Sequence, residues 1–240
     1  MVTNIGFDRS HPYFEEAADE GRFVLVGDRL AIETTPTMGT LFTIERSVDG
    51  GDTWESVLGE TESVSGAALM DWESLSYGDT LYRATATTVE GATAVAEITV
   101  PARSTALWLS GGVGYSLTCR LPLNPGVSVS GGRATSPKMF AGRTKPVIYK
   151  GEALSKVYQI TGNVTDRESV EPNASPDELM ELVRNPESLH MLRTPDGERV
   201  FGSVPGVNLG RESVTSHTDE LRPWNAFWGY QFELTEGTDA

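Results

Sequence analysis

The sequence contains very little cysteine and has no long apolar run. Cys119 is the single cysteine, which excludes an intramolecular disulfide and a cysteine metal cluster and suits assembly in a reducing cytosol. No apolar run approaches membrane-spanning length, and the first residues carry no charged and apolar leader. We therefore predict no membrane span, and we expect any export to use a route that needs no signal peptide.

Basic residues are also scarce, and they are unevenly distributed. The chain carries 19 Lys and Arg against 34 Asp and Glu, a net charge of −15, which disfavours binding to nucleic acid. Residues 104–167 reverse this balance with 8 basic against 2 acidic residues, whereas the segments before and after them are strongly acidic. The basic segment predicts complementary contacts within the chain or between subunits, and scattered solvated charges are an equally good interpretation.

Six cations of this basic segment are the best candidates for a subunit-contact surface. No aromatic residues are interleaved with them at regular positions, so a nucleic-acid groove is the weaker interpretation. The six residues are Arg133, Lys138, Arg143, Lys145, Lys150 and Lys156.

Signatures of catalysis and metal binding are lacking as well. The three histidines, His11, His190 and His217, form no HxH or HExxH pattern, and the chain has no GxSxG or Walker motif. We expect His190 to be a packed strand residue and His217 a solvated loop residue, and a metal site built from distant residues stays an alternative. The sequence therefore predicts no cofactor, no metal and no catalytic residue.

One pair of carboxylates fits glycan hydrolysis. Asp71 and Glu73 flank Trp72 and would share one face of a strand beside an aromatic ring. Such an enzyme needs two acids that face one sugar, with one acid kept protonated. We prefer a solvent-facing pair on a sandwich strand, and loss of glycan cleavage in Asp71→Asn would support the enzyme.

Glycine and proline are plentiful, at 25 and 13, and they recur between short apolar runs. This pattern predicts a mainly β protein with many turns. Residues 1–21 are polar, and we expect a mobile arm or a segment that orders against a partner. Residues 22–102 contain about seven short strand patterns, two of them joined by an Asp-Gly-Gly-Asp turn at residues 49–52, which predicts a β-sandwich.

Two stretches of this first domain carry a resemblance. TIERSVDGGDTWESV and YGDTLYRATATTVEGATAVAEITVPA resemble the fibronectin type III-like domains that phage tail proteins often carry. The resemblance places the tyrosine corner of that fold at Tyr82. Residues 101–105, PARST, are predicted to be a linker.

Residues 106–236 predict a second, β-rich domain with one short helix near residues 175–184. Ser175, Pro176 and Glu178 form a capping box with proline at the first helical position, and Asn185-Pro186 ends the helix. The last strand alternates sharply, with Trp228, Tyr230, Phe232 and Leu234 on one face. We expect that face to be buried in the sheet of this domain.

The order of three stretches in this domain carries a second resemblance. GRTKPVIYKGEALSKVYQITGNV, SPDELMELVRNPESLHMLRTPDGERVFGSV and WNAFWGYQFELTE follow one another as in the minor tail, or distal-tail-like, proteins of long-tailed phages (siphophages) of actinobacteria, which they resemble. The resemblance implies a virion component at the tail tip, assembled in the host cytoplasm as a ring of copies, hexamer or trimer. Its further partners would be tail tube or tail-tip subunits.

From these patterns we expect a structural protein of a phage tail tip or baseplate that assembles through protein–protein contacts and is not an enzyme. The alternative is a carbohydrate-binding adhesin that contacts host-wall glycan. In that case exposed aromatic side chains such as Trp54 or Trp72 would grip the sugar, so their burial in the fold decides against it.

Overall fold

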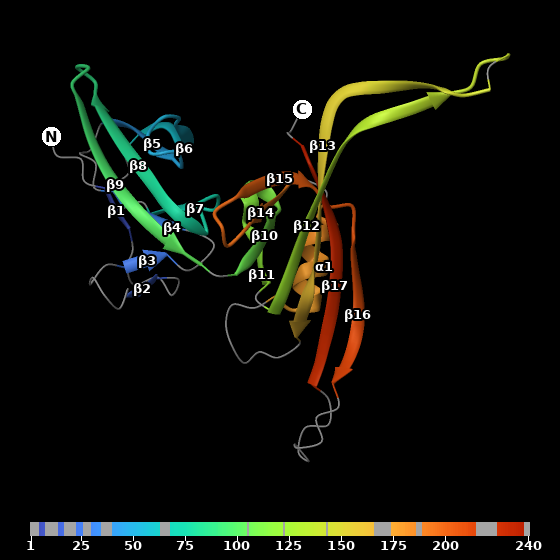
Figure 1. The fold of residues 1–240 in the computed structure, drawn as a ribbon. Helices are drawn as coiled ribbons and strands as arrows, with labels where there is room; N and C mark the ends of the chain where they lie inside the picture. The colour runs from blue at the N-terminus through green and yellow to red at the C-terminus, as the bar shows by residue number, and fades with distance from the viewer. Residues whose placement is uncertain are drawn as a thin grey trace. The chain divides into compact units, whose positions relative to one another are not determined.

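The computed structural model describes residues 5–7, 14–16, 23–25, 30–34, 40–62, 68–104, 106–121, 123–142, 144–165, 174–185, 189–214 and 225–237. These residues are mainly β and contain one α-helix and one short 3₁₀ helix, as predicted (Figure 1). The chain divides into two compact units. The first unit is Met1–Trp108 together with Arg193–Arg199, and the second is Leu109–Leu192 together with Val200–Ala240.

The first unit is β-sandwich-like and is built from two sheets. The six-stranded sheet has the order β2 (Phe14–Glu16), β3 (Phe23–Leu25), β9 (Thr93–Arg103), β8 (Tyr77–Thr88), β5 (Thr40–Ser47) and β6 (Glu55–Glu62). The three-stranded sheet has the order β1 (Ile5–Phe7), β4 (Leu30–Thr34) and β7 (Ala68–Asp71). All pairings are antiparallel except that of β3 with β9.

Two three-residue strands lie within residues 1–21, where the sequence predicts a mobile arm or a segment that orders against a partner. Ile5–Phe7 pairs with β4, and Phe14–Glu16 pairs with β3. Each strand is only three residues long, which is too short for an alternation of apolar and polar residues to stand out in the sequence.

Alternation along β8 builds the core of the first unit. Tyr82, Ala84 and Ala86 point inward and pack with Phe42 and Ile44 of β5. Two buried residues of β9 complete the cluster from the other side of β8. The small alanines allow the larger side chains of neighbouring strands to fill the same layer at the close packing of a protein interior.

The second unit is organised around one eight-stranded sheet. Its order is β11 (Leu117–Leu121), β10 (Leu107–Gly111), β14 (His190–Arg193), β15 (Arg199–Ser203), β17 (Asn225–Glu236), β13 (Val147–Thr165) and β12 (Leu123–Lys138), and β16 (Val207–Val214) also pairs with β17. The 3₁₀ helix η1 (Val113–Tyr115) makes the turn between β10 and β11.

The predicted burial of the last strand is confirmed except at Trp228, which is half-buried. Tyr230, Phe232 and Leu234 of β17 are buried, while Gln231 and Glu233 on the other face are exposed. The ring of Tyr230 lies across its partner Gly162 on β13, where a Cβ atom would overlap the Tyr230 hydroxyl. Glycine at position 162 is therefore required by this close approach.

Helix α1 (Pro176–Arg184) is the α-helix that the sequence predicted. Ser175 accepts from the backbone N–H of Glu178, and the Glu178 carboxylate accepts from the backbone N–H of Ser175, so the capping box is confirmed. Leu179, Leu182 and Val183 are buried, and the acidic residues of the helix remain exposed. The helix thus anchors one apolar face and presents a mainly acidic surface outward.

Candidate protein-contact surface

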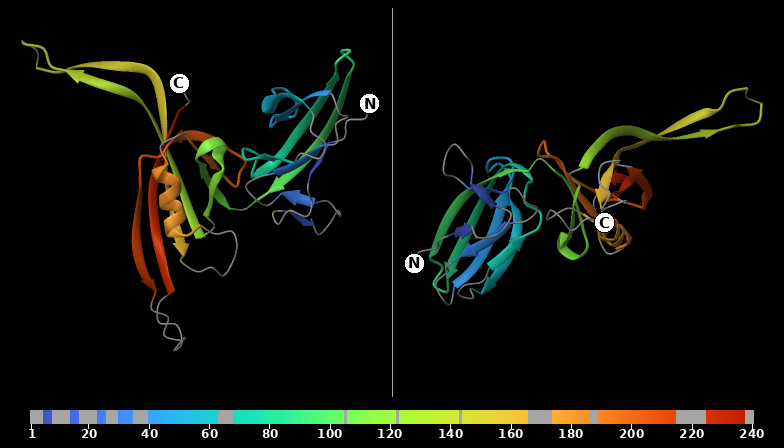
Figure 2. Two further views of the ribbon diagram at one scale, coloured as in Figure 1. Left: turned by 180° about the vertical axis from the view of Figure 1, so that it is seen from behind. Right: turned by 90° about the horizontal axis from the view of Figure 1, so that it is seen from below.

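The strands β12 and β13 extend well beyond the sheet that holds them. β13 pairs with β17 only from Val157 to Thr165, whereas β12 and β13 continue to pair with each other out to Lys138 and Val147. Among the pairings of the described residues, the ribbon has two strands beyond Ser130 and Val157, and Figures 1 and 2 show it projecting from the sheet. We call residues 131–156 the arm.

The ribbon that carries the arm exposes an unusual amount of apolar surface. Six of the eleven large apolar side chains that are exposed among the described residues belong to it: Val127, Val129, Met139, Phe140, Ile148 and Tyr149. A two-stranded hairpin is at best marginally stable in water by itself. Exposed apolar side chains that gather on one element mark sites of contact with other molecules.

The six cations singled out in the sequence all belong to the arm. Arg133 and Lys138 are exposed on β12, Lys145 is exposed just before β13, and the ammonium of Lys138 lies 5.5 Å from the ring centroid of Tyr149. Lys156 on β13 is 3.7 Å from the Glu236 carboxylate. Lys150 belongs to β13, but the structure does not describe its side chain. Arg143 lies outside the described residues. Their role in subunit contacts stays a prediction.

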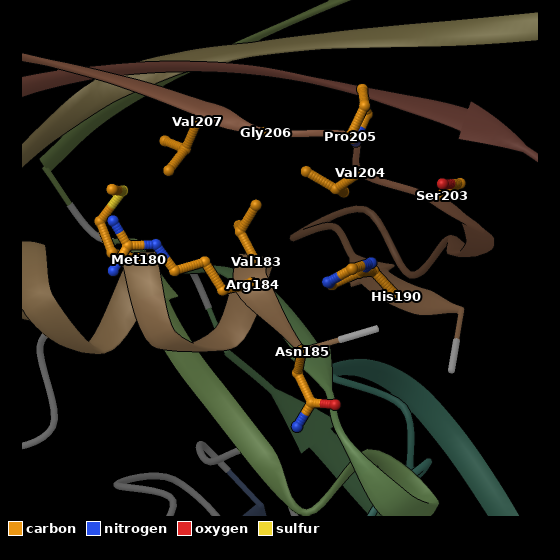
Figure 3. Close-up of a pocket in the computed structure, with 10 residues that line it drawn as sticks. All are labelled: Met180, Val183, Arg184, Asn185, His190, Ser203, Val204, Pro205, Gly206 and Val207. Atoms are coloured by element: carbon orange, nitrogen blue, oxygen red, sulfur yellow. The ribbon is translucent and has the colours of Figure 1, made fainter. Parts of the chain in front are cut away.

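A pocket of about 430 Å³ opens in the second unit between α1 and the segment that joins β15 to β16. Val183 of α1 faces Val204 of the joining segment and Val207 at the start of β16 there, with Met180 and Pro205 at the sides (Figure 3). Its volume is within the range of sites that enclose small molecules.

His190 lies in the wall of this pocket. It is 4% exposed, and its Nε2 is 3.3 Å from the Leu182 carbonyl oxygen. That oxygen can only accept, so Nε2 carries the hydrogen and donates it. Burial lowers the pKa of His190 below 6.5, which keeps the ring neutral at pH 7. Gly111 lies against the ring, where a Cβ atom would be 3.1 Å from Cδ2. His190 is therefore a packed strand residue, as predicted.

A buried ion-pair network occupies the first unit, and sequence patterns did not indicate it. Arg46 donates to Asp71 at 2.6 Å, to Glu73 at 2.5 Å and to Glu55 at 2.8 Å. Burial alone would lower the pKa of Arg46, but the nearby carboxylates of Asp71, Glu73 and Glu55 outweigh it and raise this pKa above its ordinary value. The guanidinium is thus held charged within the protein.

The expectation of a solvent-facing pair is wrong for Asp71, whereas the Glu73 side chain is partly exposed. Asp71 is 2% exposed, and it accepts from both Arg46 and the Tyr82 hydroxyl, the latter at 2.6 Å. The same guanidinium engages Glu73. Both carboxylates are therefore committed to structural partners, which does not favour the proton-donating acid that glycan hydrolysis requires.

Tyr82 also differs in detail from the tyrosine corner that the resemblance implied. Its hydroxyl donates to the Asp71 carboxylate, whereas the hydroxyl of a tyrosine corner bonds to backbone. Burial, reinforced by the charge of Asp71, raises the pKa of Tyr82 well above its usual range. Tyr82 therefore serves as a neutral hydrogen-bond donor in the network.

The network is completed by residues far along the chain. The turn between β14 and β15, Arg193–Arg199, belongs to the first unit. Arg199 donates to both oxygens of Glu55, at 2.8 and 2.9 Å, and to the backbone carbonyl of Glu73 at 3.0 Å. Burial would raise the pKa of Glu55, but its bonds to Arg199 and Arg46 outweigh it and lower this pKa.

The two tryptophans proposed for glycan binding are half-buried. The guanidinium of Arg83 lies 3.9 Å from the ring centroid of Trp54 and covers one of its faces. The turn before Trp54 is fixed by Asp49, which accepts from the backbone and hydroxyl of Thr53 and from the Ser47 hydroxyl. Neither tryptophan is fully buried, so burial does not exclude the adhesin hypothesis.

The remaining candidates provide no further site in the part of the chain that is described. There, no group of three or more His, Cys, Asp and Glu side chains is arranged to hold a metal. Cys119 is buried on β11. Within the same residues, no helix is long and apolar enough to cross a membrane. His11 and His217 lie outside the described residues.

Comparison with known proteins gave no match, either to a family model or to the sequence of a curated protein.

Proposed function

We propose that this chain is a structural subunit of a phage tail tip or baseplate and that it acts by assembling with copies of itself and with neighbouring tail proteins. The observation that supports this most strongly is the arm. It is a two-stranded extension with exposed apolar side chains and a net charge of +5, from six cations and Glu152, on a chain whose net charge is −15.

The arm suits contact with a partner for two physical reasons. Covering its apolar side chains removes surface from water, which contributes about 25 cal/mol for each Å² buried. Its positive charge attracts the acidic surfaces that predominate elsewhere in the sequence, which steers a partner toward it. A repeated contact of this kind closes into a ring when the rotation between copies allows it.

Shortening the arm tests the proposal. Ser130 and Val157 are register partners, so residues 131–156 can be replaced by Asn-Gly, which closes a tight hairpin. We expect the full chain to form oligomers that increase with concentration in sedimentation velocity, and the shortened chain to remain monomeric and to unfold cooperatively on heating. A full chain that stays monomeric at every concentration and is absent from purified tails would contradict the proposal.

A parallel measurement addresses the adhesin hypothesis. Pull-down of the full chain on purified actinobacterial cell wall, compared with Trp54→Ala and Trp72→Ala, measures binding to glycan directly. Under the assembly proposal we expect no retention that depends on either tryptophan. Retention lost in both variants, with self-association unchanged, would favour the adhesin.

A further inference from the structure

The end of the arm presents two exposed apolar side chains. Met139 and Phe140 follow the last residue of β12, and their exposed fractions are 65% and 46%. In the sequence, Lys138 precedes them and Lys145 follows them, and both lysines are also exposed. A large aromatic side chain at the end of a projecting element is the type of residue that anchors protein interfaces.

The same unit contains the pocket between α1 and the β15–β16 segment, which we call the α1 pocket and which could receive such a side chain. Val183, Val204 and Val207 line it, and the Pro205-Gly206 backbone runs between Val204 and Val207 (Figure 3). The pocket therefore offers apolar contact from its valines, while Arg184, Asn185, His190 and Ser203 supply polar groups to the rest of its lining.

The charges around the two features are complementary. The arm has a net charge of +5, whereas the exposed charged residues of α1 are Asp177, Glu178, Glu181 and Arg184, a net of −2. Asp177, Glu181 and Arg184 follow the spacing of one helical stripe, in which Arg184 lines the pocket and the two carboxylates lie on the preceding turns. The acidic part of this stripe attracts the lysines beside Phe140.

In Figures 1 and 2 the far end of the β12–β13 ribbon lies away from α1 of its own unit, so a pocket reached by this end belongs to another copy. We propose that Met139 and Phe140 of one copy dock into the α1 pocket of a second copy of this chain. The contact joins two different patches and therefore propagates from copy to copy, closing into a ring or extending as a filament. This proposal rests on the proposed function, because both require association through the arm.

Cross-linking between two different single-cysteine variants tests the docking. Ala141→Cys places a thiol beside Phe140, and Ser203→Cys places one at the exposed rim of the pocket. The native Cys119 is buried, so the unmodified chain measures the background. We expect a short bismaleimide to join the two variants into a mixed dimer. Ser56→Cys, an exposed serine of β6, replaces Ser203→Cys as the matched control and should give no mixed dimer above background.

Two further variants separate docking from chance encounter. Adding Phe140→Ala to the Ala141→Cys copy should lower the mixed-dimer yield by about tenfold or more, as expected when an aromatic anchor is truncated. Adding Val207→Trp to the Ser203→Cys copy fills the pocket from its own side and should lower the yield similarly. Circular dichroism of each variant verifies that it remains folded.

The results distinguish the two proposals. Equal yields with Ser203→Cys and Ser56→Cys, while arm shortening still abolishes self-association, would overturn docking in the pocket and leave the proposed function standing. Unchanged self-association after arm shortening would overturn both. If the full chain sediments with phosphatidylglycerol vesicles, the arm-shortened chain does not, and no mixed dimer forms, docking in the pocket is overturned. The partner of the arm would then be a lipid surface.

Discussion

At the scale of single residues, the first unit depends on charges placed inside it. Arg46 is buried among three carboxylates and Asp71 between a guanidinium and a hydroxyl, so each charge has the partners that burial demands. Removal of one partner leaves another charge buried and uncompensated, which costs far more than the pair itself contributes.

Asp71→Ala should therefore lower the free energy of unfolding by about 3–5 kcal/mol, because Asp71 is the most buried of the three carboxylates that bind Arg46 and is also the acceptor of the Tyr82 hydroxyl. Arg46 would keep only Glu55 and Glu73, which are partly exposed. Glu45→Ala is the matched control, since Glu45 pairs with a partly exposed Arg83 at 2.7 Å and should cost less than about 1 kcal/mol. Urea denaturation of both variants measures the difference. Equal losses of unfolding free energy in the two variants would show that the buried network contributes no more to stability than a partly exposed ion pair.

The same network predicts how stability depends on pH. The pKa of Glu55 is lowered in the folded protein from its ordinary value of 4.5, so the unfolded chain binds this proton first. The stabilisation is fully present above pH 4.5 and is lost as the pH falls through the lowered pKa. We expect Glu55→Gln to reduce the slope of unfolding free energy against pH below 4.5, as measured by denaturation at a series of pH values. An unaltered slope would assign the acid sensitivity to other groups.

At the scale of elements, the turn between β14 and β15 is part of the first unit, although its sequence position lies within the second. Thr194 accepts from the Ser76 hydroxyl through its carbonyl oxygen, and Arg193 donates to the Ser74 carbonyl. Together with Arg199 these contacts join residues separated by more than a hundred positions. Folding of the first unit is therefore coupled to the later part of the chain.

Arg199→Ala should lower the unfolding free energy of the first unit by about 1.5–3 kcal/mol, the range for hydrogen bonds to charged groups. Lys156→Ala, which removes a largely exposed ion pair with Glu236, should change stability by less than about 1 kcal/mol. Hydrogen exchange of β5 and β8 amides measures the effect on the first unit. Faster exchange in Lys156→Ala than in Arg199→Ala would contradict the coupling.

Elements whose signals are local could be predicted from the sequence. Ser175, Pro176 and Glu178 lie within four residues of one another, and they fix the start of α1 through contacts that the sequence itself displays. The burial of Tyr230 and Phe232 follows from alternation in the same way.

Features that depend on distant partners could not be predicted. The pairing of Arg46 with Asp71 spans 25 positions and that of Arg199 with Glu55 spans 144, and neither leaves a periodic trace. The six cations could be recognised as a group, but their place on a two-stranded arm depends on where β17 stops pairing with β13. The α1 pocket likewise depends on the approach of three separate segments.

At the scale of the whole molecule, the arm is basic and the rest of the sequence is acidic. Contacts between these surfaces weaken when ions screen them, because the Debye length falls from about 10 Å at 0.1 M salt to about 3 Å at 1 M. We expect self-association of the full chain to weaken as salt rises, and the double variant Lys138→Gln, Lys145→Gln to flatten this dependence in sedimentation velocity. Association that strengthens with salt would instead indicate a purely apolar contact.

Electron microscopy of the purified full chain beside the arm-shortened chain tests most directly whether the molecule acts by assembling through its arm. We expect closed rings for the full chain at high concentration and single particles for the shortened one. Single particles for both chains at every concentration, or identical rings from both, would contradict assembly through the arm.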